Sequence, residues 1–484
     1  MLKRTRGYAV LATVVCLTLS SSAQLQAQND PSNAAYPAVP NHGDTKSHVP
    51  LVQKNASGWY TTIAVQNLSE TNQANVGVSF YSNSATADHV VNLQIPAGAP
   101  SVVSTSSLAA LPGGYLGSAV VSSDKEVAVA FVQSDETSTA ASRGTNQGSS
   151  TTFLTQAFYD GGSGIGRATR FVIQNTGIQS ATVNVSCTDG HVSNFMVGVN
   201  QSVIRDEEGQ THFEPNFNCT VTSDQPIADL QEIRDLDFPD VFIIEGLPAT
   251  GGTCVAPATM LQSQGRSTTS ILTHVGNAMA NAGWQYEDAA GSGTTLDPLE
   301  SVLALDATLP IGYRGGMLAD GDQPLFVYVD MRDTSTDGDQ TAGYAARCTP
   351  DQGGELFTPL ALKNAGGVAR GRIGSSYFNI FNVGAGPTEI TVTFTDANGS
   401  TSSPQSKTPD LHSLAPFMLG ADESIEIDLS SLSHAELPDG LYAAKIESDG
   451  QPLAAVVLLN FAAASIFTDG FESGDTSSWS STVQ

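Results

Sequence analysis

The sequence predicts an all-β protein that consists of four tandem antiparallel β-sandwich modules. Three observations support this prediction. A block of segments recurs four times along the 484 residues, at intervals of roughly 100 residues, the size of one sandwich domain. Within the blocks, apolar and polar residues alternate, which is the period of a strand with one face in a core. Charged residues make up 14% of the chain, below the roughly 25% of ordinary domains, and helical periodicity is nearly absent.

Residues 1–27 have the three parts of a secretory signal peptide. A basic start and an apolar stretch come first, and small residues then precede the expected cleavage near Ala23 or Ala27. The apolar stretch is shorter than the roughly 20 residues of a membrane span, and no later segment is apolar enough to be one. We therefore expect an extracellular or cell-surface protein without a membrane span, in which residues 28–47 form a disordered N-terminal segment.

Each block begins with an extended entry, followed by a strand that ends in asparagine. An alternating segment follows, most clearly at residues 74–81, 181–187 and 389–396, and glycine, Asn and Asp then turn the chain. A middle strand comes next, and a hairpin closes the block. In the third copy, residues 281–291 replace the clean alternating strand, which we interpret as an inserted loop. The four strand-ending asparagines are Asn67, Asn175, Asn277 and Asn382.

The closing hairpin is the most recognisable part of the repeat. It occupies residues 111–133, 309–330 and 437–459, while residues 217–232 keep its second half alone. A Ser-Asp pair lies at its centre in three copies, and such side chains commonly bond the nearby backbone in turns. We therefore expect Asx-type turn roles, rather than catalytic or metal-binding roles, for Asp124, Asp224 and Asp449.

Six or seven short strands in about 100 residues are typical of an immunoglobulin-like β-sandwich. Four such modules in series predict an elongated rod, and the alternative is that the modules pair into two larger bodies. A Ser-, Thr- and Gly-rich segment after the first module indicates a flexible linker, and the linker after the second module is expected to pack along a module boundary. The modules are placed at residues 48–135, 151–236, 254–348 and 355–463, and the linkers at 136–150 and 237–253.

Four cysteines remain after removal of the signal peptide, and secreted proteins usually hold such even sets as disulfides. Two of them lie in the second module and two bracket the third. We therefore expect Cys187 to pair with Cys219, and Cys254 to pair with Cys348. The alternatives are a zinc site or free thiols, although no CxxC or His-rich spacing supports zinc.

Composition and motifs narrow the function. The formal net charge of −28 argues against nucleic acid and anionic membranes as partners. The nucleophile elbow GxSxG, the zinc helix HExxH and the phosphate-binding P-loop are absent from the sequence. We expect a non-enzymatic secreted or cell-surface protein with an adhesion, matrix or structural role, whose partner is a surface or matrix component, protein or glycan. The alternative is a carbohydrate-binding accessory protein or a component of a carbohydrate-active enzyme.

Two candidate sites stand out. Asp333, Asp337 and Asp339 have the oxygen density that calcium prefers, but they lack the spacing of a helix-loop-helix calcium site, so the alternative is a solvated acidic turn. Apart from calcium, no cofactor is expected. Trp284 with Tyr286 lies in the irregular third copy, and exposed rings there would form a stacking platform for a sugar.

The C-terminal tail carries a resemblance. Residues 464–484 include DGFESGDTSSWS, which resembles a short tail of the form DGFESGDTSxWS at the ends of otherwise unrelated secreted bacterial proteins. The resemblance implies export from a bacterial cell, with sorting or surface retention. The body is similar to uncharacterised tandem-sandwich proteins of bacterial envelopes, through strands such as GSAVVSSD followed by VAVAFV. The tail departs from known anchor signals because it lacks a hydrophobic span followed by basic residues.

Overall fold

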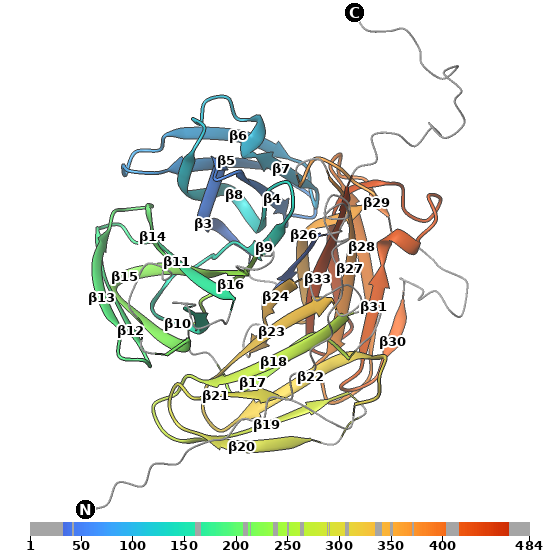
Figure 1. Ribbon diagram of the computed structural model, residues 1–484. Coiled ribbons are helices and arrows are strands. Elements are labelled where there is room, and N and C mark those ends of the chain that lie inside the picture. Colours follow the sequence, from blue (N-terminus) through green and yellow to red (C-terminus); the bar gives the residue numbers. More distant parts are fainter. Residues whose placement is uncertain are drawn as a thin grey trace, which may run out of the picture.

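The computed structural model of the protein is built from antiparallel β-strands (Figure 1). Two short 3-10 helices, η1 (Thr105–Ser107) and η3 (Leu429–Ser431), are the helical elements among the described residues. The all-β, antiparallel prediction is confirmed. The structure describes residues 32–463 apart from 41–42, 160–165, 207–211, 213, 236–240, 249–250, 262–265, 288, 290, 305–308, 334–340, 349–351, 370–371 and 403–415.

The strands group into four units that follow one another along the chain. Strands of the first unit are β3 (Asp44–Ala56), β4 (Trp59–Asn67), β5 (Ala74–Tyr81), β6 (His89–Ile95), β7 (Pro100–Ser104), β8 (Tyr115–Ser134) and β9 (Thr139–Arg143). Strands of the second unit are β10 (Ser149–Phe158), β11 (Arg167–Asn175), β12 (Ala181–Cys187), β13 (Val192–Val197), β14 (Ser202–Asp206), β15 (Asn216–Asp235) and β16 (Val241–Glu245).

In each of these two units, one seven-stranded sheet bends around a core. The first sheet has the order β6-β5-β8-β3-β4-β7, with β9 paired to β8. The second has the order β13-β12-β15-β11-β14, with β10 and β16 paired to β15. Because β8 and β15 are each 20 residues long and pair with different strands at their two ends, each sheet curves in the manner of a barrel.

The third and fourth units each contain two sheets. Strands of the third unit are β17 (Thr253–Leu261), β18 (Arg266–His274), β19 (Ala280–Tyr286), β20 (Ser292–Leu296), β21 (Ser301–Ala304), β22 (Tyr313–Gly321), β23 (Leu325–Asp333), β24 (Thr341–Ala345) and β25 (Arg347–Cys348). Strands of the fourth unit are β26 (Glu355–Lys363), β27 (Arg372–Asn382), β28 (Thr388–Asp396), β29 (Thr401–Ser402), β30 (Phe417–Leu419), β31 (Ser424–Asp428), β32 (Gly440–Ser448) and β33 (Leu453–Ala463), joined by β1 (Ser32–Pro37) and β2 (Val39–Pro40).

The sheets of these two units correspond to each other. In the third unit their orders are β20-β19-β22-β17-β25 and β21-β18-β23-β24. In the fourth unit they are β2-β26-β32-β28-β29, with β30 on β28, and β1-β33-β27-β31. An apolar core fills the space between the sheets of each unit.

The alternation of apolar and polar residues produces the strands that it predicts. Along β5 and β12, every second side chain is buried and the others are exposed or half-buried. The same pattern occurs in β19, where Ala280, Ala282, Trp284 and Tyr286 are the buried members. Because β19 pairs regularly with β20 and β22, the interpretation of residues 281–291 as an inserted loop is wrong for the stretch that forms this strand.

The predicted closing hairpin is not a hairpin. Strands β22 and β23 follow each other along the chain but lie in different sheets, as do β32 and β33. In the first unit, β8 runs without interruption through the Ser-Ser-Asp sequence. Its first half pairs with β3 and β5, and its second half pairs with β4 and β9. The polar centre is therefore the point at which the chain crosses from one side of the unit to the other.

The aspartates at this crossing bind the neighbouring strand. Asp124 accepts hydrogen bonds from the backbone N–H and the side-chain amide of Asn75, both at 2.8 Å. Asp224 accepts from the backbone N–H of Thr182 at 2.7 Å, and Asp449 accepts from that of Glu389 at 3.0 Å. The carboxylates cap the start of β5, β12 and β28, so the expected local Asx turn is replaced by a contact between strands. In the third unit Asp322 bonds Asn281 in the same way.

Three of the four strand-ending asparagines share one role. The side-chain amides of Asn67, Asn175 and Asn382 are buried, and each donates to a backbone carbonyl oxygen of the loop that follows, four or five residues later. In the third unit Asn277 is exposed, and the buried His274 ends the strand instead. His274 pairs with Leu325 as Asn175 pairs with Ile227. The prediction for Asn277 is therefore wrong by three positions, because an imidazole replaces the amide.

Four short strands join the units at the centre of the molecule. Strands β9, β16 and β24 follow the last long strand of the first, second and third unit and pair with it. The fourth unit receives its corresponding strand from the start of the described chain, because β1 pairs with β33 through six residue pairs, from Ser32↔Phe461 to Pro37↔Val456. We call β1, β9, β16 and β24 the ring strands.

The ring strands close the four units into a ring. Strand β1 packs against β9 and β24, and β16 packs against the same two strands. Figure 1 shows the result, with the blue, green, yellow and orange units arranged around β9, β16 and β24. The expected elongated rod is therefore wrong, since β1, which precedes the first unit in the chain, belongs to a sheet of the fourth unit and packs against β9 of the first.

Two segments expected to lack structure are strands. The described part of 28–47 contains β1, β2 and the start of β3, and the linker 136–150 contains β9. Burial explains both differences. Ala34, Ala35 and Tyr36 are at most 2% exposed, as are Ala140 and Ala141. These small and aromatic residues fit the crowded centre of the ring. The two segments were predicted to be unstructured because each is short and has polar residues on both sides.

Both predicted disulfides are present. Cys187 is bonded to Cys219, across from each other on β12 and β15. Cys254 is bonded to Cys348, across from each other on β17 and β25. The second disulfide joins the first strand of the third unit to the segment that leaves it, 94 residues later.

Candidate functional site

The aromatic pair proposed as a sugar platform lies in the core. Trp284 is 8% exposed and Tyr286 is 5% exposed, and both pack in the core of the third unit. The Tyr286 hydroxyl donates to the backbone oxygen of Ala304 at 2.6 Å. The prediction of a stacking platform is wrong, because a ring enclosed by protein atoms has no face for a pyranose. The regular alternation of β19 turns both rings inward.

The acidic cluster proposed for calcium falls at the edge of the described chain. Asp333 ends β23, and its side chain, together with Asp337 and Asp339, lies outside the described residues. Within the described ranges, no group of three or more His, Cys, Asp or Glu side chains has the arrangement of a metal site. The calcium hypothesis therefore stays a prediction.

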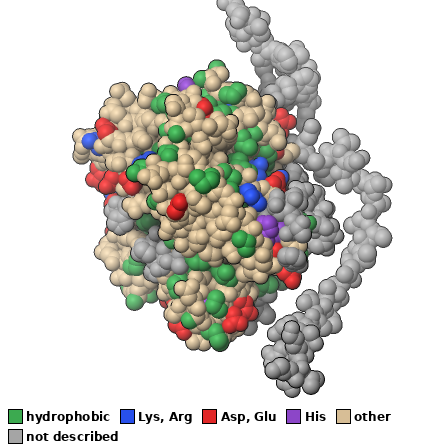
Figure 2. Space-filling view, turned by 90° about the vertical axis from the view of Figure 1, so that its left-hand side faces the viewer, with side chains coloured by type: hydrophobic (Ala, Val, Ile, Leu, Met, Phe, Trp, Pro, Cys, Tyr) green, Lys and Arg blue, Asp and Glu red, His purple; other side chains and the backbone are tan. Residues whose placement is uncertain are grey.

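The targeting segments also lie outside the described residues. This applies to the signal peptide at 1–27 and to the tail at 464–484. Among the residues that are described, no helix is long and apolar enough to cross a membrane. The two disulfides suggest an oxidising, extracellular environment. On the face shown in Figure 2, acidic side chains form small scattered groups and basic side chains are few.

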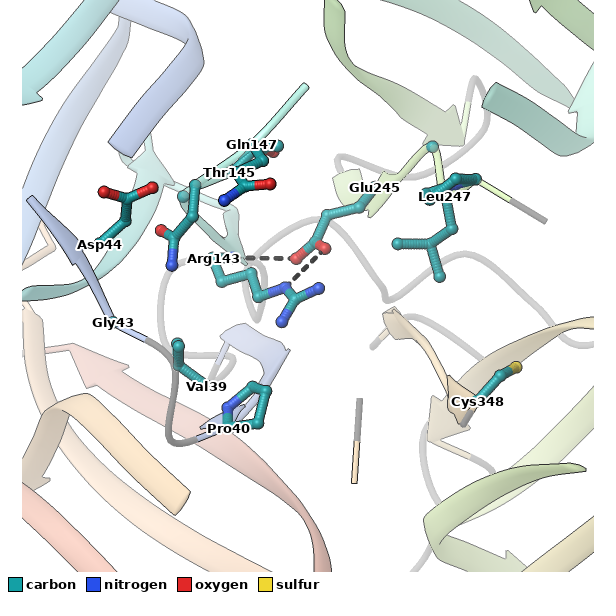
Figure 3. Close-up of a pocket in the computed structure, with 14 residues that line it drawn as sticks. Val39, Pro40, Gly43, Asp44, Arg143, Thr145, Gln147, Glu245, Leu247 and Cys348 are labelled. Carbon is teal, nitrogen blue, oxygen red and sulfur yellow. Dashed lines mark hydrogen bonds and ion pairs between the residues drawn. The ribbon is translucent and has the colours of Figure 1, made fainter. Parts of the chain in front are cut away.

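A cavity lies where the four ring strands end. It has a volume of about 680 Å³, within the range of roughly 300–1,000 Å³ that holds small ligands. Residues from all four junctions between units contribute to it, and Figure 3 shows their side chains around an open centre. We call this cavity the axial pocket, lined by residues 39–40, 43–44, 143–147, 245–248 and Cys348.

Two charged residues occupy equivalent positions on neighbouring ring strands. Arg143 lies opposite Ala130 on β8, and Glu245 lies opposite Leu230 on β15. The Arg143 Nε and the Glu245 carboxylate are 2.8 Å apart, and their side chains are 15% and 7% exposed. Glu245 also accepts from the backbone N–H of Arg143 and from the Ser142 hydroxyl. Because both charges are largely withdrawn from water, hydrogen bonds of this kind are needed to offset their desolvation.

A second acid lies behind the pocket wall. Asp229 is 2% exposed, and burial raises the pKa of its carboxyl from 3.8 to about 7. The Thr152 hydroxyl donates to its Oδ2 at 2.6 Å, while its Oδ1 has no hydrogen-bond partner among the described residues. A Cβ added to Gly246, which lines the pocket, would come within 2.3 Å of Oδ1. Asp229 can therefore lie against the pocket wall because residue 246 has no side chain.

The position of Asp229 is apolar in the other units. The backbone N–H groups of Ala38, Gly144, Gly246 and Ala346 donate to the carbonyl oxygens of four equivalent residues. Those residues are Ala455, Val129, Asp229 and Val327 respectively. The second unit therefore has an ionisable group where the repeat otherwise places a small apolar one, next to the Arg143–Glu245 pair.

The axial pocket is suited to hydrogen bonding rather than to stacking. Its lining offers a guanidinium, two carboxylates from Asp44 and Glu245, and the side-chain amides of Asn146 and Gln147. Leu247 and the two prolines add apolar surface, and none of the described lining residues is aromatic. Such a lining fits a small polar ligand.

Sequence reasoning missed this site because it compared modules and treated the segments between them as linkers. A usable signal is present in those segments. Each has a short run of small or apolar residues followed by a small residue, at Ala38, Gly144, Gly246 and Ala346. Extending the repeat beyond each module would have aligned these four positions and shown that the first of them precedes all of the modules.

Comparisons with known proteins do not assign a family. No family model matches the chain, and no curated protein matches it. Nine chains of solved structures show local similarity. One of them, described as "Crystal Structure of Thermotoga maritima 1070", is 10% identical with a TM-score of 0.18, and the match covers 21% of this chain and 96% of that chain. A TM-score this low carries no conclusion about the fold or function of this chain.

Proposed function

We propose that the protein is a non-enzymatic secreted or cell-surface protein with an adhesion, matrix or structural role. The observation that supports this proposal is the closed ring of four units. A ring holds the loops of all four units in fixed relative positions, and loops on a rigid scaffold commonly carry binding. The two disulfides support a location in an oxidising environment. The partner would be a surface or matrix component, protein or glycan.

The test is binding of the purified mature chain, residues 28–484, to intact bacteria, isolated envelopes and a glycan array. Saturable binding that is lost after reduction and unfolding would support the proposal. The matched control is a chain with Ile178→Ser, a change at an exposed side chain that should leave the fold intact. Absence of saturable binding by a folded chain would refute an adhesion role. Steady release of sugar or peptide fragments from envelopes would refute the non-enzymatic part.

A second candidate function is carbohydrate binding through the axial pocket. The observation that favours it is the set of amide and charged groups among the described lining residues, which suits a hydroxyl-rich ligand held by hydrogen bonds. Calorimetric titration with the glycans that score in the array would test this function. Asn146→Ala should weaken binding at least tenfold, while Trp284→Ala should leave it unchanged in any chain that remains folded.

We also propose that the four units are variants of one immunoglobulin-like sandwich and that residues 464–484 sort or retain the protein at the surface. The shared strand order of the third and fourth units supports a common origin. The tail proposal rests on its resemblance to tails of secreted bacterial proteins. Deleting residues 464–484 and measuring the protein in cell-surface and medium fractions tests it. An unchanged distribution between the fractions would contradict it.

A further inference from the structure

The fourth unit differs from the others in the origin of its ring strand. In the first three units the ring strand follows the last long strand of the same unit, as β9 follows β8. In the fourth unit, β33 ends at Ala463 and its partner is β1, which precedes the first unit. Strand β1 thus fills a groove formed by residues far away in sequence, such as Leu360, which lies 324 positions from Tyr36. We call this space, between β33, β26, β9 and β24, the strand groove.

The strand groove recognises particular side chains as well as a backbone. Tyr36 is fully buried, its hydroxyl donates to the backbone oxygen of Leu360, and it accepts from the Leu360 N–H at 3.2 Å. Burial raises the pKa of this hydroxyl. Ala34 and Ala35 are each 2% exposed on opposite faces of β1, in the cores of the fourth and third unit. An extended peptide must therefore have a tyrosine preceded by two small residues to fit.

The beginning of the segment is recognised separately. The Ser32 hydroxyl accepts a hydrogen bond from Arg372 Nη1 at 2.6 Å and one from the Thr139 hydroxyl at 2.9 Å. Arg372 also donates to the backbone oxygen of Glu136 at 2.9 Å. Strand β2 continues the pairing, with Val39 opposite Phe357 on β26. Residues from the first and fourth units therefore contact the same segment, from Ser32 to Pro40.

We propose that the strand groove is a binding site for an extended peptide with the sequence of residues 32–40, and that a second copy of this chain can supply that peptide. Addition of a strand to a sheet edge is a general mode of peptide recognition, in which backbone bonds give affinity and side-chain pockets give specificity. A strand donated from one chain to the groove of the next is a head-to-tail contact, which forms open chains unless the rotation closes. This inference does not depend on the proposed adhesion role.

Within a single chain the segment is favoured by its own tether. A short connection gives an effective concentration on the order of millimolar, so closure within one chain dominates in dilute solution. Exchange between chains requires β1 to leave and is expected after refolding at high concentration. The same six residue pairs and the same Tyr36 contacts form in both arrangements, so the exchange alters the connection but not the groove.

Cysteine trapping in full mature chains tests this proposal. Ala35 lies opposite Leu458 in the β1–β33 pairing. One chain carries Ala35→Cys and another carries Leu458→Cys, and the two are mixed and refolded together at about 100 μM. A covalent dimer on a non-reducing gel is expected, at least tenfold above a control mixture of Ala35→Cys with Ile178→Cys, whose partner position is 87% exposed. A synthetic peptide of residues 32–40 should suppress the dimer, and the same peptide with Tyr36→Ala should not.

The double variant Ala35→Cys, Leu458→Cys in one chain is the second measurement. It should form a cross-linked monomer at low concentration, which establishes that the engineered cysteines meet in the groove. A cross-linked monomer with no covalent dimer above the control in the mixture would overturn the exchange between copies. Failure of the double variant to cross-link in a folded chain would overturn the assignment of the groove itself. Suppression by both peptides would overturn the role given to Tyr36.

Discussion

Replacing Asp229 with valine should stabilise the protein at neutral pH. The other units place Val129, Val327 and Ala455 at this position, so the second unit has room for an apolar side chain. Burial raises the carboxyl pKa from 3.8 to about 7, so the folded state holds the proton more tightly than the unfolded state. At pH below about 4 both states are protonated and the acid has no ionisation penalty. As the pH rises towards 7, ionisation favours the unfolded chain.

The expected size follows from the shift. Three pKa units at 1.36 kcal/mol each correspond to about 4 kcal/mol of stability lost by the natural chain between pH 4 and pH 7. Asp229→Val removes this loss but leaves the Thr152 hydroxyl without its acceptor, which costs about 1–3 kcal/mol at any pH. The variant should therefore match or fall below the natural chain at pH 4.5 and exceed it at pH 8.

Urea unfolding of both chains at pH 4.5, 6 and 8 measures the difference. Asp229→Asn is the matched control, because it keeps the size of the side chain but does not ionise. Its advantage over the natural chain should rise with pH in the same way. A difference between variant and natural chain that is equal at pH 4.5 and pH 8 would refute the reasoning, since it would mean that Asp229 does not titrate differently on unfolding.

Three further predictions concern the ring and the third unit. Glu245→Gln removes the carboxylate that faces Arg143 and should destabilise the chain by about 3 kcal/mol, measured as a lower urea midpoint; an unchanged midpoint would show that the pair is not effectively buried. Opening the Cys254–Cys348 disulfide, which spans 94 residues, should lower the free energy of unfolding by about 4.7 kcal/mol in the chain-entropy model. Opening the disulfide at Cys219, which spans 32 residues, should lower it by about 3.7 kcal/mol. Serine variants under non-reducing conditions test this order, and the reverse order would contradict it. Trp284→Ala should lower stability by about 3–5 kcal/mol without changing glycan binding, and loss of binding by a stable variant would count against its core position.

Local patterns predicted the strands well because strand periodicity depends on neighbours along the chain. The alternation in 74–81 and 181–187 gave β5 and β12, and cysteine positions within the repeat gave both disulfides. The pairing of β1 with β33 could not be predicted in this way, since its two strands lie at opposite ends of the described chain. Segment 32–40 has no long apolar run, and its burial is a property of the groove that receives it.

The alignment of the third copy was wrong because a different residue type fills the same structural position. The prediction followed asparagine, while the structure requires a buried side chain at the end of the strand with a polar atom facing the loop carbonyls. His274 meets that requirement through Nδ1, which lies 3.1 Å from the backbone oxygen of Asp297. The opposite error occurred around Trp284. The segment was predicted to be an inserted loop because it lacks a clean alternation, but it forms the regular strand β19.

The position of β1 has a consequence for the order in which the protein is made and folded. Residues 32–40 are synthesised before all four units, but their partner strand β33 is synthesised after the others. The first two units can build their cores while this segment is unpaired, whereas the cores of the third and fourth units, which include Ala35 and Ala34, are completed last. Contacts of such high sequence separation slow folding. The first described strand to be synthesised is therefore the last to find its partner, and its partner edge on β33 is exposed to aggregation in that interval.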